Sequence, residues 1–377
     1  MQWLRLLIFT SIFAGFHVFI YRRYIHDLTE DPRLRRYGKI AVGALLALLI
    51  GGGPLGRIVP NPVSAALTPA GWPWTGVTVY LALTVAVLAG FRFVARRAVP
   101  RHPLMDPSRR LFLSRVTAGG ALAAGGAMSG FGAWRAYAPA DVTELTVKLP
   151  RLPSALEGFT IAQVTDIHVG PNIRRQFMDD MVGRVNALKP DLVAITGDLV
   201  DGDIPTLGHS VAALQNLKAR YGRYFITGNH EYFSGDEDWC AAVQGLGVDV
   251  LRNRHQTIGD AGGAFVLAGV DDWSAAYDLD TALQGRNPDL PVVLLAHQPA
   301  NFQEAVGKGV DLQLSGHTHG GQMFPFNLVV AMAFPYSAGS YRHGQGQLYV
   351  SRGTGFWGPP FRTGSPPEIV KVTLTRG

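Results

Sequence analysis

The sequence has 377 residues, more than one typical domain of roughly 100–200 residues. Hydrophobic residues make up 47% and charged residues 16%, which excludes a disordered chain, and a single cysteine excludes an intramolecular disulfide and a cysteine-based zinc site. The formal net charge of +6 divides unevenly, because residues 1–140 hold 16 Lys/Arg and 4 Asp/Glu whereas residues 141–377 hold 18 and 24. The basic excess lies among apolar runs, which indicates a membrane anchor rather than a nucleic-acid surface.

Four apolar stretches occupy this first part of the chain. They are Trp3–Ile20, a run from Ile40 to about Leu55, Val77–Val94 and Leu111–Trp134. A bilayer core of ~30 Å needs ~20 mostly apolar residues per helix. The second stretch is short and rich in glycine, so a re-entrant or interfacial segment stays open there. We predict an anchor of about four transmembrane helices over residues 1–140.

Positive charge in the connecting segments predicts the topology. Residues 21–39 and 92–110 each carry six Lys/Arg, whereas residues 51–74 carry only Arg57. Positive loops stay in the cytoplasm. We therefore expect a multi-pass protein of the cytoplasmic (inner) membrane, with everything after the fourth helix on the extracytoplasmic side.

A second signal precedes the fourth stretch. The run Ser108-Arg109-Arg110-Leu111-Phe112-Leu113 resembles a twin-arginine export signal. The alternative is a plain topogenic boundary, since arginine pairs flank many membrane helices.

From Val142 onwards, short β-rich runs alternate with helical stretches. The expected strands are Phe159–Val164, Leu192–Thr196, Tyr224–Thr227, Phe265–Val270, Val292–Ala296, Leu312–Leu314, Leu348–Ser351 and Ile369–Leu374. Apolar residues at helical spacing predict a helix from Phe177 to Leu188 that ends at Lys189-Pro190, and another from Val211 to Leu217. This alternation predicts one α/β domain over residues 141–377.

Polar segments follow five of these expected strands. They are Asp166-Ile167-His168, Gly197-Asp198, Gly228-Asn229-His230-Glu231, His297 and Gly316-His317-Thr318-His319. Sites in open α/β sheets form beyond the carboxyl ends of strands, so these groups can meet at one place. Carboxylate oxygen and imidazole nitrogen without thiolate suit Mn, Fe, Zn or Ni. With His230 set aside, the candidate ligands are too many for one catalytic ion, and they suit two ions ~3.5–4 Å apart that share a carboxylate and a bridging water.

The order of these segments resembles the calcineurin-like metallophosphoesterase superfamily, from about Phe159 to Leu374. The flanking residues Leu199-Val200-Asp201 and Gly320-Gly321-Gln322 also match. A multi-helix anchor before the domain resembles a bacterial membrane-anchored branch of that superfamily. The resemblance implies an α/β fold in four layers, α-β-β-α, with two mixed β-sheets packed together, here preceded by an α-helical transmembrane region.

The resemblance also implies a role for each site residue. The implied ligands are Asp166, His168 and His319 for the first ion, Asn229, His297 and His317 for the second, and Asp198 as the bridge. His230 would be catalytic, either stabilising the transition state or protonating the leaving oxygen, and Asp201 would orient it. The alternative for Asp201 is a solvated loop acid. The implied reaction is hydrolysis of a phosphomonoester or phosphodiester by a metal-bridging hydroxide, with Mn, Fe or Zn.

These inferences predict a membrane-anchored, metal-dependent phosphoric ester hydrolase. The anchor favours a lipid or cell-envelope substrate, and the net charge of the second part argues against a nuclease, so no nucleic-acid partner is expected. The alternative is a non-catalytic membrane scaffold or sensor with a structural metal site, which an intact His230 disfavours. Cys240 is expected to pack rather than react, and Arg174-Arg175 to begin a helix rather than grip phosphate. The aromatic loop Phe356–Phe361 could line the substrate groove, touch the bilayer or pack in the core.

Overall fold

The computed structural model describes residues 2–59, 61–98, 106–260 and 262–377. The chain forms two compact units. One comprises Met1–Trp134 with Gly358–Phe361, and the other comprises Arg135–Trp357 with Arg362–Gly377. Arg101, which belongs to the second basic segment predicted above, lies outside the described residues.

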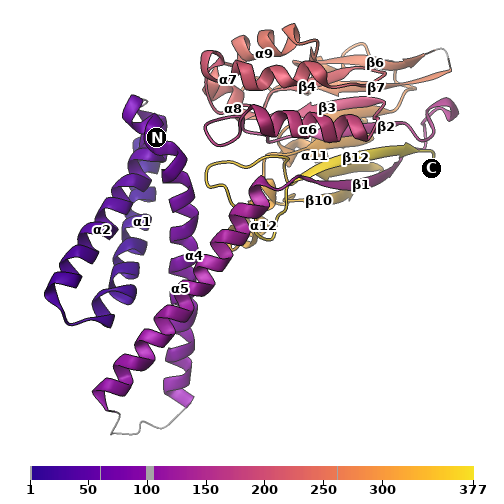
Figure 1. Ribbon diagram of the computed structural model, residues 1–377. Coiled ribbons are helices and arrows are strands. Elements are labelled where there is room, and N and C mark those ends of the chain that lie inside the picture. The colour runs from indigo at the N-terminus through magenta and orange to yellow at the C-terminus, as the bar shows by residue number, and fades with distance from the viewer. Residues whose placement is uncertain (1, 60, 99–105, 261) are drawn as a thin grey trace. The chain divides into compact units, whose positions relative to one another are not determined.

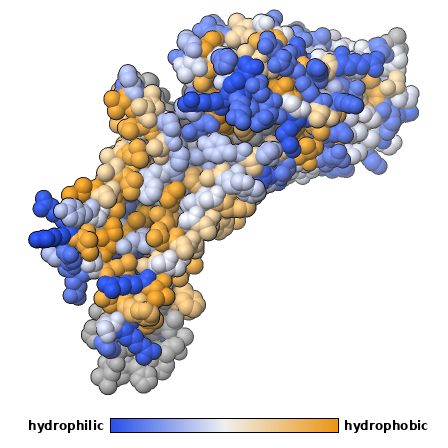
Figure 2. Space-filling model, viewed as in Figure 1, coloured by the Kyte–Doolittle hydropathy of each residue, from blue (hydrophilic) through white to orange (hydrophobic). Residues whose placement is uncertain are grey.

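The N-terminal unit is helical. Its helices are α1 (Gln2–Tyr24), η1 (His26–Leu28), α2 (Pro32–Gly52), α3 (Pro54–Ile58), α4 (Pro62–Ala98) and α5 (Pro107–Tyr137), the last of which continues into the second unit. The described residues contain four helical segments long and apolar enough to cross a membrane: Leu6–Leu28, Pro32–Gly56, Pro62–Phe91 and Leu111–Tyr137. Figure 2 shows the hydrophobic colouring that covers much of these helices.

Helix α2 is longer than the apolar stretch from which it was predicted. Asp31 caps its first turn by accepting a hydrogen bond from the Arg33 N–H, and Pro32 occupies the first helical position. The helix therefore begins eight residues before Ile40, and its 21 residues extend over ~31 Å. By length and composition, residues Pro32–Gly56 qualify as a candidate membrane span.

The second unit contains two β-sheets. In spatial order, the first is β1 (Asp141–Lys148), β12 (Glu368–Thr375), β2 (Thr160–Val164), β3 (Leu192–Thr196), β4 (Arg223–Ile226) and β5 (Asp249–Val250). The second is β10 (Gly339–His343), β11 (Gly346–Val350), β9 (Leu312–Ser315), β8 (Val292–Leu295), β7 (Gly263–Gly269) and β6 (Arg254–Asp260). Both sheets are mixed. In the first, β2, β3 and β4 are parallel and β12 runs antiparallel to β2. In the second, the edge strands β6 and β10 run antiparallel to their neighbours.

Helices and short 3₁₀ turns connect these strands. They are η2 (Ser154–Leu156), α6 (Arg175–Ala187), α7 (Ile204–Val211), η3 (Ala212–Asn216), α8 (Asn229–Ser234), α9 (Asp236–Gly245), α10 (Leu279–Leu283), η4 (Pro299–Asn301), α11 (Phe302–Gly307), η5 (His319–Gly321) and α12 (Phe326–Ala333). The helix predicted up to Leu188 is α6. The helix predicted from Val211 to Leu217 is wrong in its bounds, because α7 ends at Val211 and a 3₁₀ turn follows.

Alternating side chains along the strands define the layers. Ile161 of β2 packs into a core between the two sheets, together with Phe265 and Val293 of the second sheet. The next residue, Ala162, faces the opposite way, into a core shared with α6, α7 and α9. On the far side of the second sheet, Leu294 packs against α10 and α11. The layers are therefore helix, sheet, sheet and helix, as predicted, and Figure 1 shows α6 and α7 along the first sheet.

Candidate metal centre

Each predicted polar segment begins at the carboxyl end of a strand. Asp166 follows β2, Asp198 follows β3, and Asn229 follows β4 and opens helix α8. In the second sheet, His297 follows β8 and His317 follows β9. Since β2, β3 and β4 are parallel neighbours, as are β8 and β9, each sheet presents its segments along one edge.

The backbone at these segments adopts an uncommon conformation. Within the described ranges, eight residues other than glycine have a positive φ, and five of them are predicted ligands. These five are Asp166, His168, Asp198, His317 and His319, with φ between 51° and 73°. Residues with a Cβ rarely adopt this left-handed backbone conformation unless the surrounding structure imposes it. Residues held in this way cluster at functional sites.

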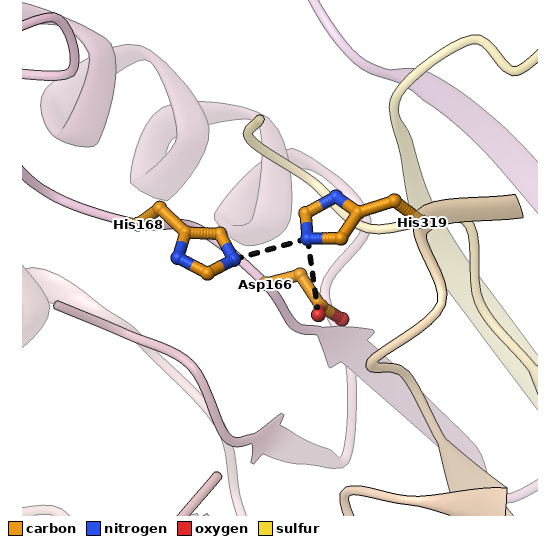
Figure 3. A group of neighbouring side chains, drawn as sticks. All are labelled: Asp166, His168 and His319. Atoms are coloured by element: carbon orange, nitrogen blue, oxygen red, sulfur yellow. Dashed lines mark hydrogen bonds and ion pairs between the residues drawn. The ribbon is translucent and has the colours of Figure 1, made fainter. Parts of the chain in front are cut away.

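Asp166, His168 and His319 form a first group (Figure 3). The Nε2 atoms of the two histidines lie 3.0 Å apart, and His319 Nε2 lies 3.4 Å from Asp166 Oδ1. The Asp166 carboxylate also accepts hydrogen bonds from the Thr165 hydroxyl at 2.8 Å and from the His317 N–H at 3.0 Å. Two imidazole nitrogens and one carboxylate oxygen thus converge on one point.

Asp198, His297 and His317 form a second group. His297 Nε2 lies 3.2 Å from Asp198 Oδ2, while its Nδ1–H donates to the Thr196 carbonyl at 2.9 Å. This second contact fixes the tautomer and leaves the Nε2 lone pair for a ligand, as in metal-binding histidines.

Three buried atoms of the residues predicted to hold the second ion lack a hydrogen-bond partner. They are Asn229 Oδ1, His297 Nε2 and His317 Nδ1. Buried polar atoms are nearly always satisfied, so three such atoms at one site require an explanation. A divalent ion provides one, since amide oxygen and imidazole nitrogen are ordinary ligands for Mn, Fe and Zn. The residues present therefore fit a metal ion.

Asp198 belongs to the second group and also lies beside His168 of the first. Its Oδ2 lies 3.7 Å from His168 Nε2 as well as 3.2 Å from His297 Nε2. Its Oδ1 accepts the backbone N–H of His230 at 2.9 Å. Although burial favours the neutral carboxyl, the surrounding histidines, His297 first, hold the pKa of Asp198 below its ordinary value. An ionised oxygen ligand is thus available between the two groups.

The buried histidines respond to the same charges. Burial opposes protonation of His297, but the Asp198 carboxylate prevails and raises its pKa. For His319, burial and then the guanidinium of Arg362 lower the pKa, which keeps this imidazole neutral. Burial and then His297 likewise lower the pKa of His317. Neutral imidazole is the form that binds metal, so His317 and His319 are ready to bind, whereas His297 would release its proton to a bound ion.

His230 and Asp201 also lie at the site. His230 Nδ1 is 2.5 Å from Asp201 Oδ1, and His168 Nδ1 is 3.2 Å from the same oxygen. Because an ionised carboxylate only accepts hydrogen bonds, both imidazoles donate from Nδ1 and present Nε2 toward Asp198. The Asp201 side chain is 11% exposed, which does not fit the alternative of a solvated loop acid. His230 also forms a possible ligand group with His168 and Asp198.

Glu231 is a site residue to which sequence reasoning assigned no role. Its fully buried carboxylate accepts the backbone N–H groups of Gly228 and Asp198 at 2.6 and 2.9 Å on one oxygen. The other oxygen accepts those of Leu199 and Val200 at 2.8 and 3.3 Å. Burial, and then the Asp198 charge, raise the pKa of Glu231 to about 7. Glu231 thus joins the loops that follow β3 and β4, which carry Asp198 and Asn229.

Arg362 is a second residue that sequence reasoning missed. Its buried guanidinium donates to the carbonyl oxygens of His319 at 3.2 Å and Arg352 at 2.7 Å, and its Nη2 lies 3.0 Å from His319 Nδ1. It therefore holds the segment that carries His319. Nothing in its spacing marks it, because His319 lies 43 residues away in the chain.

Three further residues discussed from the sequence lie as follows. Arg174 precedes α6 and donates to the Pro171 carbonyl at 2.9 Å, and Arg175 pairs with Asp179 at 2.9 Å. Both contacts suit a helix start. Cys240 is buried, and burial raises the pKa of its thiol to about 12, which agrees with a packing role.

Comparisons with known proteins now give the family. A family model described as calcineurin-like phosphoesterase matches residues 159–321. A bovine "Transmembrane protein with metallophosphoesterase domain" is 34% identical over an alignment of 385 residues, and the match covers 95% of this chain and 86% of the bovine protein. This chain belongs to the calcineurin-like metallophosphoesterase family.

Bacterial relatives agree with this assignment. An "Uncharacterized metallophosphoesterase" of Helicobacter pylori is 38% identical over an alignment of 253 residues, and the match covers 64% of this chain and 66% of that protein. The "Uncharacterized metallophosphoesterase YkuE" of Bacillus subtilis is 34% identical over an alignment of 281 residues, and the match covers 71% of this chain and 97% of that protein. Since the bovine relative is named as a transmembrane protein, the membrane-associated form is not confined to a bacterial branch.

Family and site together support a phosphoester hydrolase with a divalent metal site. The clustered aspartates and histidines have the donor atoms that such a site needs. The apolar helices, together with the relatives named as transmembrane proteins, support association with a membrane.

Proposed function

We propose that this protein is a membrane-anchored phosphoester hydrolase with a dinuclear metal centre. The observation that carries the proposal is the pair of ligand groups on either side of Asp198, together with the buried atoms of Asn229, His297 and His317 that lack a hydrogen-bond partner. The ligands would be Asp166, His168 and His319 for one ion, Asn229, His297 and His317 for the other, and Asp198 for both. Mn, Fe and Zn all suit these donors.

When bound, the two ions would supply an activated water molecule and neutralise charge on the phosphoryl group. The protein's own part is to place the ligands before substrate arrives. Asp201 and the Thr196 carbonyl orient His168 and His297 through Nδ1. Glu231 and Arg362 fix the backbone of the segments that carry Asp198 and His319. This preorganisation lowers the cost of binding a transition state.

His230 would be the proton donor to the leaving oxygen. Its Nδ1–H is engaged by Asp201, so its Nε2 is directed at the space beside Asp198, 4.0 Å from Oδ2. A protonated imidazole there could pass its Nε2 proton to the departing alkoxide, and Asp201 would stabilise the charged ring. Asp201 is thus proposed as a positioning residue for His230.

We further propose residues 1–140 as the membrane anchor and 141–377 as the catalytic domain. The six positive residues in each of segments 21–39 and 92–110, against one in 51–74, support a catalytic domain on the extracytoplasmic side of the cytoplasmic membrane. Arg109 and Arg110 would belong to a twin-arginine signal. The anchor favours a lipid or cell-envelope phosphoester as substrate.

The experiment that tests the proposal is a hydrolysis assay of the full chain in detergent micelles with Mn²⁺. The substrates are p-nitrophenyl phosphate, bis-p-nitrophenyl phosphate, nucleotides and phospholipids. We expect at least one substrate to be hydrolysed, and this activity to be lost with a chelator or in Asp198→Asn. The control variant Asp289→Asn, at an exposed carboxylate, should behave as wild type. A folded, metal-loaded chain inactive on every substrate would instead support the non-catalytic scaffold or sensor.

A further inference from the structure

An apolar helix of the second unit is largely exposed. Helix α12 (Phe326–Ala333) has no buried residue. The exposed large side chains in and beside it are Phe324, Phe326, Leu328, Val329, Met332 and Phe334, with exposed fractions from 38% to 81%. Residues 320–341 contain no charged side chain, although the domain as a whole holds many. Contiguous apolar surface of this kind on a soluble domain marks an interaction site.

Both ends of α12 are tied to the proposed metal ligands. At its start, a Cβ on Gly321 would lie 2.3 Å from Asn327 Cα, so the helix packs directly on the 3₁₀ turn that contains His319. Just beyond its end, the ring of Phe334 lies 6.3 Å from that of His317, centroid to centroid. Helix α12 therefore has a fixed position beside the ligand segment.

Two exposed aromatic rings extend this surface to the catalytic side of the site. Phe233 and Trp357 lie with their ring centroids 5.6 and 6.1 Å from that of His230. Gln322, two residues before Phe324, exchanges two hydrogen bonds with the Trp357 backbone, at 2.8 and 2.9 Å. Gln322 thus ties the start of the α12 segment to the backbone of Trp357. We call the six side chains at α12 together with Phe233 and Trp357 the apolar rim.

We propose that the apolar rim contacts the lipid bilayer and that the substrate is a phosphoester in a lipid headgroup. The proposal rests on the hydrolase function proposed above and specifies its substrate class. An amphiphile would place its acyl chains along the uncharged rim and its phosphate at the ligand groups. Phenylalanine and tryptophan beside aliphatic side chains are the residues that helices present to a bilayer surface.

The occupant is a bilayer because the same chain brings one within reach. Helix α5, a candidate membrane span, ends at Tyr137, and β1 begins at Asp141. The three residues between them extend over at most ~11 Å. A bilayer around α5 is therefore held at a high effective concentration near the domain. The net charge of residues 141–377, with 18 Lys/Arg against 24 Asp/Glu, makes this contact hydrophobic rather than electrostatic.

The first test locates the rim in a membrane. The full chain with Met332→Cys is labelled with an environment-sensitive fluorophore and reconstituted in phosphatidylcholine vesicles. Gln244→Cys on α9 is the matched exposed control, and wild type with its buried Cys240 gives the labelling background. We expect nitroxide-bearing lipid to quench the label at position 332 and aqueous iodide to quench the label at position 244.

Two results of this test would contradict the proposal. Quenching of the label at position 332 by iodide as strongly as at position 244 would place the rim in water. Shielding of that label from both quenchers would show that a protein, including a second copy of this chain, covers the rim instead.

The second test separates this inference from the hydrolase function. Rates are measured for phosphatidic acid and phosphatidylglycerol in vesicles and for the soluble p-nitrophenyl esters. We expect Met332→Asp and Leu328→Asp to lower the ratio of the vesicle rate to the soluble rate roughly tenfold or more, and Gln244→Asp to leave it unchanged. A wild-type chain inactive on all esters would refute the hydrolase function. Hydrolysis of soluble esters with an unaltered ratio, or with no lipid hydrolysis, would refute the lipid inference alone.

Discussion

Replacing His230 with alanine separates proton donation from metal binding. In the proposed scheme His230 contributes no ligand atom, because its Nδ1 is held by Asp201 at 2.5 Å and its Nε2 lies 4.0 Å from Asp198 Oδ2. The variant should therefore keep its fold and its bound metal. It should lose a positioned general acid, which contributes ~10²–10⁴ in rate, or ~2.7–5.4 kcal/mol of transition-state stabilisation.

The leaving group decides how much of that loss appears. p-Nitrophenolate departs without protonation, so its ester should lose the least in His230→Ala. An alkyl ester releases a strongly basic alkoxide and should lose the full amount. The assay compares kcat for both esters, with metal content measured on the same samples. A fall in metal content would make His230 a ligand, as its proximity to His168 and Asp198 permits. Equal losses of kcat on both esters would instead mean that His230 acts on the phosphoryl oxygens.

Three further predictions address the fold and the anchor. Glu231→Gln exchanges one carboxylate oxygen for an NH₂ group and leaves two buried backbone N–H groups without an acceptor. At ~1–3 kcal/mol for each group, the free energy of unfolding should fall by ~2–6 kcal/mol. A loss below ~1 kcal/mol in a denaturant titration would refute the role of Glu231. Burial raises the pKa of the Cys240 thiol to about 12, so the folded chain should resist alkylation at mildly alkaline pH and react only when denatured; rapid native alkylation would contradict that burial. Reporters fused after residue 30 should be cytoplasmic and those after residues 65 and 150 exported, and a cytoplasmic reporter at 150 would overturn the topology. When Arg109 and Arg110 are both changed to lysine, export should stop if they form a twin-arginine signal. Unchanged export would leave them as topogenic charges.

The predicted strands and the missed strands occupy different places in the two sheets. All eight predicted strands are interior, and the four missed strands, β1, β5, β6 and β10, are the edges of the two sheets. Interior strands are covered on both faces, so they form continuous apolar runs such as Leu192–Thr196. Edge strands keep polar, exposed residues, as in Arg254–Asp260, and carry no such signal.

The residues of the site also divide into those that the sequence predicts and those that it does not. Residues that follow an apolar strand, such as Asp166 and His297, could be found because the strand end predicts their location. The supporting contacts of Glu231 and Arg362 could not, because their partners are backbone groups that only the folded chain brings near. An apolar run such as Phe326–Ala333 would suggest core packing, and its exposure becomes evident only in the structure.

The central claim is a centre of two ions that share Asp198, and metal stoichiometry tests it most directly. The purified full chain is loaded with Mn²⁺, freed of excess metal and analysed for metal per chain. The proposal predicts two ions in the wild type, one in His319→Ala, which loses a first-group ligand, and a large loss in Asp198→Asn, because that carboxylate serves both ions. A wild type that binds one ion at saturation, or an Asp198→Asn chain that keeps two, would contradict the account.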